Sequence, residues 1–411
     1  MTSRALALAA VLVIVSAAAD AQTFDLQGFA TGRAMSVTGP TAWTRGGLGR
    51  FDAGGSPSEK SNSDALADLN VGFDWQPVQH ILVHAQGVAR AEPSGTRGRG
   101  IGLATAFVEA NIDKGQNTFI FRGGQFFLGT SRENVQDLWT SPYLITYSAL
   151  NSWIANEVRP IGLHGEWQLL TRNAVITTGL TAFEGNDTMG ALLVWRGWTV
   201  GNRLSLLNES VALPPLEAFK TDFPLQHQRT TPFQRDLDGR PGFAARLRYS
   251  VPERFNVQFT RVDNRGDRKL HGTEYAWDTT FDHIGAEGHL RNTTALAEWM
   301  SGHTQMGPAA TAIDVDFYAA YLLLSQKVGR HRFSARYDSF NTKDRKQSLT
   351  DRYDETGHGV TVGWLVALTP HVRAGAEVSR VVGEHLDAEE SGLEPRFNGR
   401  SVILEVRYSI K

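Results

Sequence analysis

Strict alternation of apolar and polar residues recurs along this chain, and it constrains the fold more than any other feature. In "ADLNVGFDW" (67–75) every second residue, from Ala67 to Trp75, is apolar, and the residues between them are small or polar. A period of two places the apolar side chains on one face of a β-strand and the polar ones on the other. The same alternation appears at 80–91, 103–112, 242–250, 358–364 and 402–411. These segments predict an all-β protein.

The joints between the expected strands are of two kinds, which largely alternate. The short ones are 76–79, 113–116, 252–254, 291–292, 329–330 and 369–371, and the long ones are 34–64, 128–160, 208–240, 264–280, 340–356 and 382–399. Short turns at one end and long loops at the other are typical of transmembrane antiparallel β-barrels. We predict about 18 strands, with both termini on the periplasmic side. Without the weak hairpin of 189–197 and 202–207, 16 strands remain as the alternative.

Charged residues occupy the polar faces of several strands. Arg246 and Arg248 lie two positions apart on one strand, as do Glu405 and Arg407 on another. Such rows need water or paired charges, so they can face soluble solvent or a water-filled lumen, and the second arrangement leaves the apolar faces for lipid. We therefore expect the apolar residues of 67–75 to face lipid. Aromatic residues near the strand ends are expected to form interfacial girdles: Trp75, Phe127, Trp167, Tyr249, Trp364 and Tyr408.

The first residues predict export. Arg4 precedes an apolar run, and Ala19-Asp20-Ala21 fits a small-x-small cleavage site. We predict a secretory signal peptide at 1–21 and a barrel formed by 22–411. The chain has no cysteine, which excludes disulfides and cysteine metal sites. No apolar run of about 18 residues follows the signal, so a helical membrane protein is not expected.

Several functional classes lack support in the sequence. A net charge of −2 gives no electrostatic case for binding nucleic acid. No G-x-S-x-G or H-E-x-x-H motif occurs, and "DRYDETGHG" (351–359) lacks calcium-loop spacing, so we predict no catalytic residue, metal or cofactor. The leading hypothesis is a passive porin. An outer-membrane hydrolase and a soluble periplasmic carbohydrate-binding β-protein remain alternatives.

Projecting the alternation onto a barrel gives the residues that would face the lumen. Positive and negative charges nearly cancel, so we expect modest ion selectivity, with about half of the charges paired across strands. The predicted pore-lining residues are Arg33, Asp68, Asp74, His84, Arg90, Glu109, Arg122, Glu166, Arg246, Arg248, Glu298, Arg336, Glu377 and Arg407.

Motifs within 122–165 resemble bacterial porins of the broad phosphate-selective porin O/P-like group. They are Arg122-Gly-Gly-Gln125-Phe, Glu133-Asn134, Trp139, "SPY" (141–143), "SALNSW" (148–153) and "EVRPIGL" (157–163), with similar stretches at 196–198 and 315–340. The resemblance implies an outer-membrane barrel, often trimeric, that passes small polar solutes. Phosphate-specific members concentrate lysines at the pore, whereas most lysines here lie in expected turns and loops, such as Lys60, Lys114, Lys220, Lys269, Lys343 and Lys346.

The resemblance also implies that 128–160 folds into the barrel as a constriction loop. The loop holds too many large apolar residues to be disordered. A position at a trimer interface, or as a cap outside the barrel, remains the alternative. The constriction residues we expect are Arg132, Glu133, Asp137, Trp139, Trp153, Glu157 and Arg159.

The expected partners follow from the membrane setting. We predict contacts with outer-membrane lipid and lipopolysaccharide, small polar solutes in the channel, and a homotrimer. The apolar row from Val402 to Ile410 resembles the C-terminal strand signal read by the barrel-assembly machinery, although Ile410-Lys411 replaces the usual terminal Phe.

Overall fold

The structure is a computed structural model that describes residues 22–92, 95–96, 98–226, 230–308, 312–346, 352–390 and 392–410. The predicted signal peptide at 1–21 lies outside these residues. Sixteen antiparallel strands close into one barrel, in which the first strand pairs with the last from Gly28↔Ile410 to Thr38↔Arg400. In sheet order the strands are β1 (Thr23–Thr38), β2 (Asn62–Val78), β3 (Ile81–Ala91), β4 (Ile101–Lys114), β5 (Asn117–Gln125), β6 (Ile161–Leu170), β7 (Val175–Glu184), β10 (Gly242–Val251), β11 (Phe255–Asp263), β14 (Asp278–Leu290), β15 (Thr293–Met306), β16 (Ile313–Val328), β17 (His331–Asp344), β18 (Glu355–Ala367), β19 (Val372–His385) and β20 (Arg396–Ile410).

The all-β prediction is confirmed in its 16-strand form, and the extra hairpin of the 18-strand form is wrong. Residues 189–197 contain the helix α3 (Ala191–Arg196), and 202–207 form no strand. The physical reason lies in the run from Ala191 to Trp195, which is apolar at every position and fully buried. A strand in a barrel wall needs one polar face, so this segment instead packs inside the protein.

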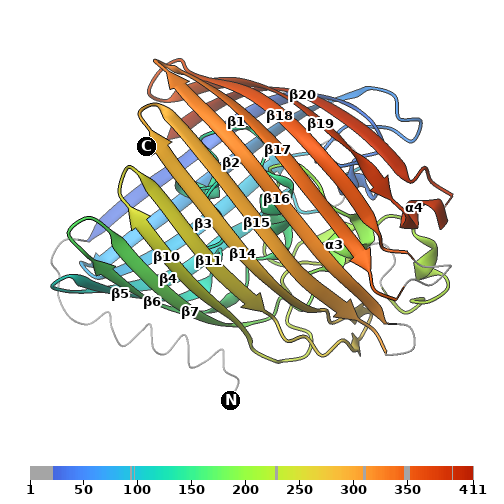
Figure 1. Ribbon diagram of the computed structural model, residues 1–411, viewed down its shortest axis with the longest axis horizontal. Helices are drawn as coiled ribbons and strands as arrows, with labels where there is room; N and C mark the ends of the chain where they lie inside the picture. Colours follow the sequence, from blue (N-terminus) through green and yellow to red (C-terminus); the bar gives the residue numbers. More distant parts are fainter. Residues whose placement is uncertain are drawn as a thin grey trace.

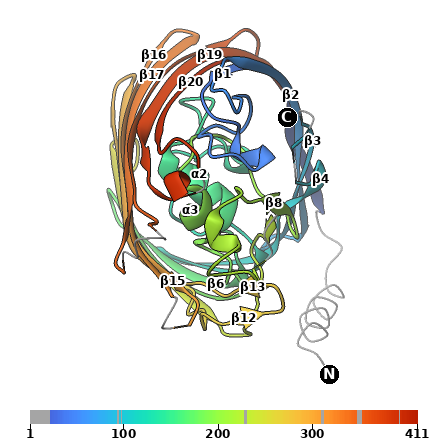
Figure 2. The same cartoon turned by 90° about the vertical axis from the view of Figure 1, so that its right-hand side faces the viewer.

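Short turns gather at one end of the barrel and long segments at the other, as the sequence predicts (Figure 1). We call these the turn end and the loop end. The long segments carry the remaining elements: η2 (Trp43–Arg45), η3 (Asp137–Trp139), α2 (Ala149–Glu157), α3, β8 (Ser210–Ala212), η4 (Glu217–Phe219), β9 (Thr230–Pro232), β12 (Leu270–His271), β13 (Glu274–Tyr275) and α4 (Asp387–Glu390). Seen from the loop end, α2 and α3 lie inside the ring of strands (Figure 2).

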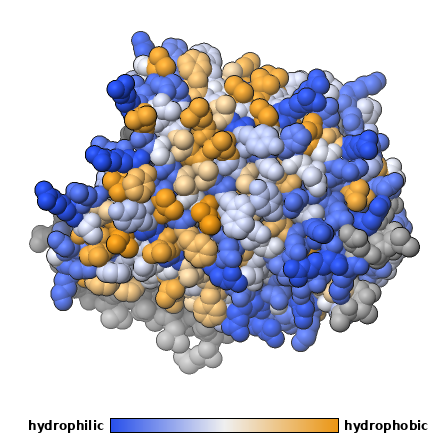
Figure 3. Space-filling model, in the orientation of Figure 1, coloured by the Kyte–Doolittle hydropathy of each residue, from blue (hydrophilic) through white to orange (hydrophobic). Residues whose placement is uncertain are grey.

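The outer surface of the wall is apolar. Leu69 and Phe73 are each about two-fifths exposed on the outside of β2, whereas Asn70 between them is buried. Hydrophobic residues spread across the strands of the visible wall, and hydrophilic residues gather toward its two ends (Figure 3). No helix among the described residues is long and apolar enough to cross a membrane. The apolar residues of the alternating pattern therefore face outward and the polar residues face inward, as a barrel in lipid requires.

The aromatic residues at the strand ends are on the outer surface with one exception. Tyr249, Trp364 and Tyr408 are exposed there. Phe127 is not part of a girdle, because it follows the end of β5 and stacks on Trp139 at a centroid distance of 4.3 Å inside the barrel. Its assignment by position was wrong because β5 ends at Gln125, two residues earlier than expected.

Two apolar clusters fill much of the interior. One surrounds Trp153 of α2, whose ring contacts Phe281 and Phe317 of the wall at centroid distances of 5.3 and 5.4 Å. The other surrounds Trp195 of α3 and joins it to Phe219 and Trp277 of other long segments. The barrel is thus packed by its own loop-end segments.

Val362 offers a direct test of the outer face. Its side chain on β18 is 55% exposed, and we expect Val362→Arg to lower the free energy of unfolding in lipid by about 2–4 kcal/mol, as for a cation near the membrane midplane. Gln168→Arg is the matched inward variant, since Gln168 lines a polar cleft and donates to Glu166 at 2.6 Å, and it should cost much less. Denaturant titration of the protein folded in vesicles measures both. Equal losses would contradict the inside-out assignment.

Candidate functional site

Three acidic side chains of the wall hold the segment 126–160 inside the barrel. Glu377 of β19 accepts hydrogen bonds from the backbone N–H groups of Ile145 and Thr146, at 2.7 and 3.2 Å. Asp338 of β17 accepts one from the N–H of Ala149 at 3.0 Å. Glu298 of β15 accepts one from the side-chain amide of Asn151 at 2.8 Å. The carboxylates satisfy loop backbone groups that water does not reach.

Arg336 of β17 completes this anchor. Its guanidinium contacts Glu133 and Asp338 at 2.8 Å each and donates to the carbonyl oxygens of Thr146 and Tyr147 at 2.7 and 2.9 Å. All of these groups are buried. Burial raises the pKa of Glu133, and the guanidinium of Arg336 opposes that shift. Three predicted pore-lining residues, Glu298, Arg336 and Glu377, therefore face the loop.

Of the remaining residues predicted for the constriction, some pack inside the barrel and others are exposed to solvent. Arg132 pairs with Glu287 at 2.8 Å, and Asp137 is exposed. Arg159 lies over the ring of Phe127 at 5.0 Å and donates to Ser205, and burial lowers its pKa to about 9. Trp139 and Trp153 lie in the apolar clusters already described.

Glu157, at the end of α2, joins two long segments. It accepts hydrogen bonds from the N–H groups of Leu192 and Leu193 in α3, at 2.9 and 3.3 Å, and from the indole of Trp153. Burial raises its pKa to about 7. Through this residue, 126–160 and the described parts of 185–241 (185–226 and 230–241) form a single plug, which packs against β14–β19.

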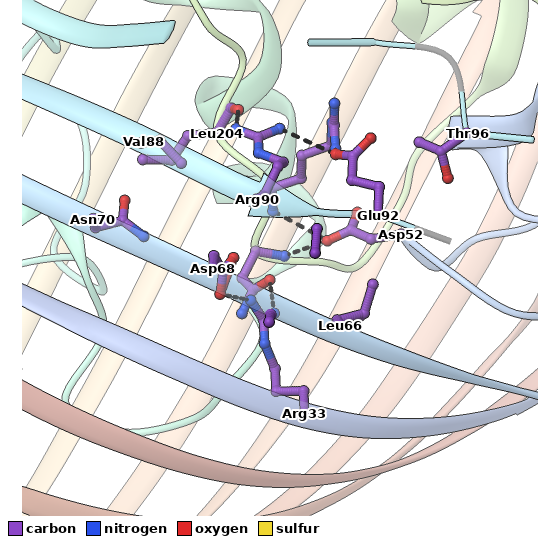
Figure 4. Close-up of a pocket in the computed structure, with 14 residues that line it drawn as sticks. Arg33, Asp52, Leu66, Asp68, Asn70, Val88, Arg90, Glu92, Thr96 and Leu204 are labelled. Carbon is purple, nitrogen blue, oxygen red and sulfur yellow. Dashed lines mark hydrogen bonds and ion pairs between the residues drawn. The ribbon is translucent and has the colours of Figure 1, made fainter. Parts of the chain in front are cut away.

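A polar cleft remains on the β1–β3 side, toward the loop end (Figure 4). We call it the loop-side cleft. Arg33 pairs with Asp68, Arg90 lies 3.6 Å from Glu92, and Arg203 pairs with Glu92 as well. A second cavity shares Arg33 and Asp68 and continues along the wall to Phe29 and Arg407. The two cavities share lining residues, so they adjoin each other between this wall and the plug.

A larger cleft of about 220 Å³ lies on the β5–β10 side, toward the turn end. We call it the turn-side cleft. Arg122, Arg246 and Arg248 line it together with Glu166 and His164. Arg122 pairs with Glu109 at 2.8 Å, and Arg246 pairs with Glu166. Arg248 donates to the hydroxyl of Thr177 at 3.2 Å and has no carboxylate within ion-pair distance among the described residues.

The last two predicted pore-lining residues lie between these clefts. Asp74 and His84 face each other across β2 and β3 at 2.6 Å, and His84 also contacts the hydroxyl of Thr105 at 3.2 Å. Nearby, Leu138 of η3 packs so closely on β2 that a Cβ at Gly72 would lie 2.5 Å from it. The tip of the plug therefore rests on the wall where β2 carries glycine.

Sequence patterns did not identify the residues that the long segments contribute to the clefts. Asp52, Asn202 and Arg203 line the loop-side cleft but lie outside any strand. Asp52 accepts hydrogen bonds from the N–H groups of Asn202 and Arg203 at 2.7 and 3.1 Å, which fixes the position of Arg203. Irregular segments have no period, so alternation gives no signal for them. Glu355, which belongs to the acidic stretch that lacks calcium-loop spacing, is the first residue of β18 and pairs with Arg50 at 3.0 Å.

Comparison with known proteins places the fold among outer-membrane channels. No family model and no curated protein matches the sequence. The outer membrane channel DcaP of Acinetobacter baumannii aligns over 96% of this chain and 99% of its own, with a TM-score of 0.56 at 10% identity. The anion-selective porin from Comamonas acidovorans covers 95% and 100%, with a TM-score of 0.55 at 9% identity. Salmonella typhi OmpF covers 96% and 99%, with a TM-score of 0.54 at 11% identity. The chain thus has a porin-type barrel fold.

The anchor at Arg336 can be tested separately from the barrel. In Arg336→Ala, Glu133 and Asp338 lose their cation while staying buried, which costs about 3–5 kcal/mol when one partner of a buried pair is removed. We expect a folded barrel whose 126–160 segment is cleaved faster in limited proteolysis. Heat-modifiable gel mobility verifies the barrel, and Arg330→Ala in the exposed β16–β17 turn is the control. Unchanged resistance to protease would show that the pair does not hold the loop.

Proposed function

We propose that this protein is a porin, exported with the signal peptide 1–21, that provides a water-filled channel for passive diffusion of small hydrophilic solutes or ions across the bacterial outer membrane. The main support is the combination of a closed barrel with an apolar outer wall and polar clefts along its inner wall. A lipid-facing exterior and a hydrated, charged interior are what such a channel needs.

The structural neighbours support the same function. Two of them are an outer membrane channel and an anion-selective porin. The motifs of 122–165 further support a place in the phosphate-selective porin O/P-like group. The structure uses part of that segment, Glu133 and "SALNSW", in the anchored plug. We propose no catalytic role for any residue, and the hydrolase remains the alternative.

Conductance measurement tests the proposal. Purified, folded protein added to planar bilayers should give stepwise ionic currents, small because the plug narrows the lumen. Vesicles containing the protein should admit small sugars. Absence of both, with protein that is folded by gel mobility, would overturn the proposal. Recovery of the protein in the soluble periplasm would favour the carbohydrate-binding alternative, and esterase or protease activity would favour the hydrolase.

We further propose a modest preference for anions, set at the turn-side cleft. Three arginines line that cleft: Arg122 pairs with Glu109 and Arg246 with Glu166, whereas Arg248 has no paired carboxylate among the described residues. A fixed positive charge beside a narrow passage attracts anions and repels cations.

Replacing the cleft arginines should change this preference. We expect Arg246→Gln with Arg248→Gln to shift the reversal potential in a salt gradient toward cation selectivity, because the double variant also frees the charge of Glu166. Arg248→Gln alone should give part of the shift. Arg330→Gln, at an exposed turn across the barrel, is the control. Identical reversal potentials in all variants would contradict a selective role for the turn-side cleft.

We also propose that the protein assembles as a homotrimer. One structural neighbour, OmpT of Vibrio cholerae, was solved in a trimer form, with a TM-score of 0.50 at 10% identity. In this chain an apolar hollow on the outer wall, lined by Leu163, Leu180 and Phe243, offers a surface for a second copy. It lies over β6, β7 and β10, which are among the shortest strands. Native mass spectrometry in mild detergent measures the subunit number, and a purely monomeric protein would contradict the proposal.

A further inference from the structure

Three aspartates meet where the two ends of the long β7–β10 segment come together. Asp187 follows the end of β7, and Asp236 and Asp238 precede the start of β10. One carboxylate oxygen from each lies within 4.8 Å of the others. Asp187 is buried, Asp238 is half-buried and Asp236 is exposed, so the cluster has a solvent-accessible side.

The backbone fixes this arrangement. The N–H groups of Asn186 and Asp187 donate to the carbonyl oxygen of Arg235 at 2.9 and 2.8 Å. The carbonyl oxygen of Asp187 accepts from the N–H of Trp277 at 2.6 Å. One oxygen of the Asp187 side chain, Oδ2, accepts from the N–H of Leu237 at 2.6 Å. The three carboxylates are therefore held together by contacts that do not themselves neutralise their charge.

The other oxygen of the Asp187 carboxylate, Oδ1, accepts no hydrogen bond from the described residues. It is also fully buried. A buried, unpaired carboxylate oxygen beside two further carboxylates is unfavourable unless a cation is present. Burial and the charges of Asp238 and Asp236 accordingly raise the pKa of Asp187 to about 6.

The protein itself supplies little compensating charge. Among the described residues, Arg240 is the one cation within ion-pair distance of the cluster: its Nε lies 3.9 Å from Oδ2 of Asp238, and its side chain is half exposed. Lys269 and His271 pair with Asp267 instead, at 3.7 and 3.0 Å. Backbone N–H groups of Gly239, Arg240 and Asp267 donate to Asp236 and Asp238 at 2.7 Å each, but they carry no full charge. The cluster thus keeps an excess of negative charge on carboxylate oxygens, which are the ligands preferred by hard divalent cations.

We propose that Asp187, Asp236 and Asp238 bind one calcium ion, which joins the two ends of the β7–β10 segment. Calcium binds oxygen ligands at about 2.3–2.6 Å in flexible geometry, so ligands on opposite sides of it are up to about 5 Å apart. Magnesium requires about 2.0–2.1 Å and nearly ideal octahedral geometry. Asp187, Asp236 and Asp238 lie in irregular segments outside the strands, and the flexible coordination of calcium suits carboxylates that no regular element holds in an octahedral arrangement.

Calcium titration tests the site. Full-length protein refolded in detergent without lipopolysaccharide, then treated with a chelator, is titrated with calcium chloride in a calorimeter. This preparation removes the calcium that lipopolysaccharide itself would bind. We expect one calcium ion per chain, higher thermal stability with calcium than without it, and binding of magnesium at least about tenfold weaker.

Two variants keep the result decisive. Asp187→Asn retains the size of the side chain, and Asp236→Asn changes an exposed one, so the second should fold even if the first does not. Each should weaken calcium binding at least about tenfold, because affinity depends on the number of charged ligands. Asp222→Asn, in the same segment but outside the cluster, should bind as the wild type does. Wild-type protein without calcium binding, equal binding in all variants, or equal affinity for magnesium would overturn the proposal.

Discussion

The structure depends on one constraint, that every backbone N–H and C=O group of the wall must find a partner within the sheet. Lipid offers none, so a spanning sheet has to close on itself. Here closure is made by the β1–β20 pairing, which joins the two ends of the described chain from Gly28↔Ile410 to Thr38↔Arg400. Once the ring is closed, its sixteen strands enclose a space that the long segments must fill or leave to water.

How that space is divided follows from the backbone of the plug. The segment 126–160 has irregular stretches, and their buried N–H groups also need acceptors. Wall carboxylates such as Glu377 and Asp338 provide them, and Arg336 balances the resulting charge. The side of the barrel that carries these residues becomes dry and packed. On the sides formed by β1–β3 and β5–β10, polar clefts remain between the wall and the plug.

The alternation of inward and outward residues along each strand explains why so much of the barrel could be predicted. Whether a residue faces lipid or lumen depends only on its position in its own strand, so Leu69 and Asn70 were assigned without knowing any neighbour. The same rule fails where the chain leaves the wall. The run from Ala191 to Trp195 was assigned to a strand although its burial depends on α2 and other long segments, and Phe127 was placed on the wall although β5 had already ended. The positions of these residues are determined by tertiary contacts, which leave no periodic pattern in the sequence.

Arg336 and Arg248 show what this means for function. Both belong to inward faces of strands, and sequence alone makes them equivalent pore-lining residues. In the folded protein the plug supplies Glu133 and two carbonyl oxygens to Arg336, which also pairs with Asp338 of its own strand. Arg248, by contrast, donates to a single hydroxyl. The electric field inside the barrel is therefore set by the charges that the plug leaves unpaired. The net charge of all inward-facing residues can therefore be close to zero while positive charge is in excess locally at the turn-side cleft.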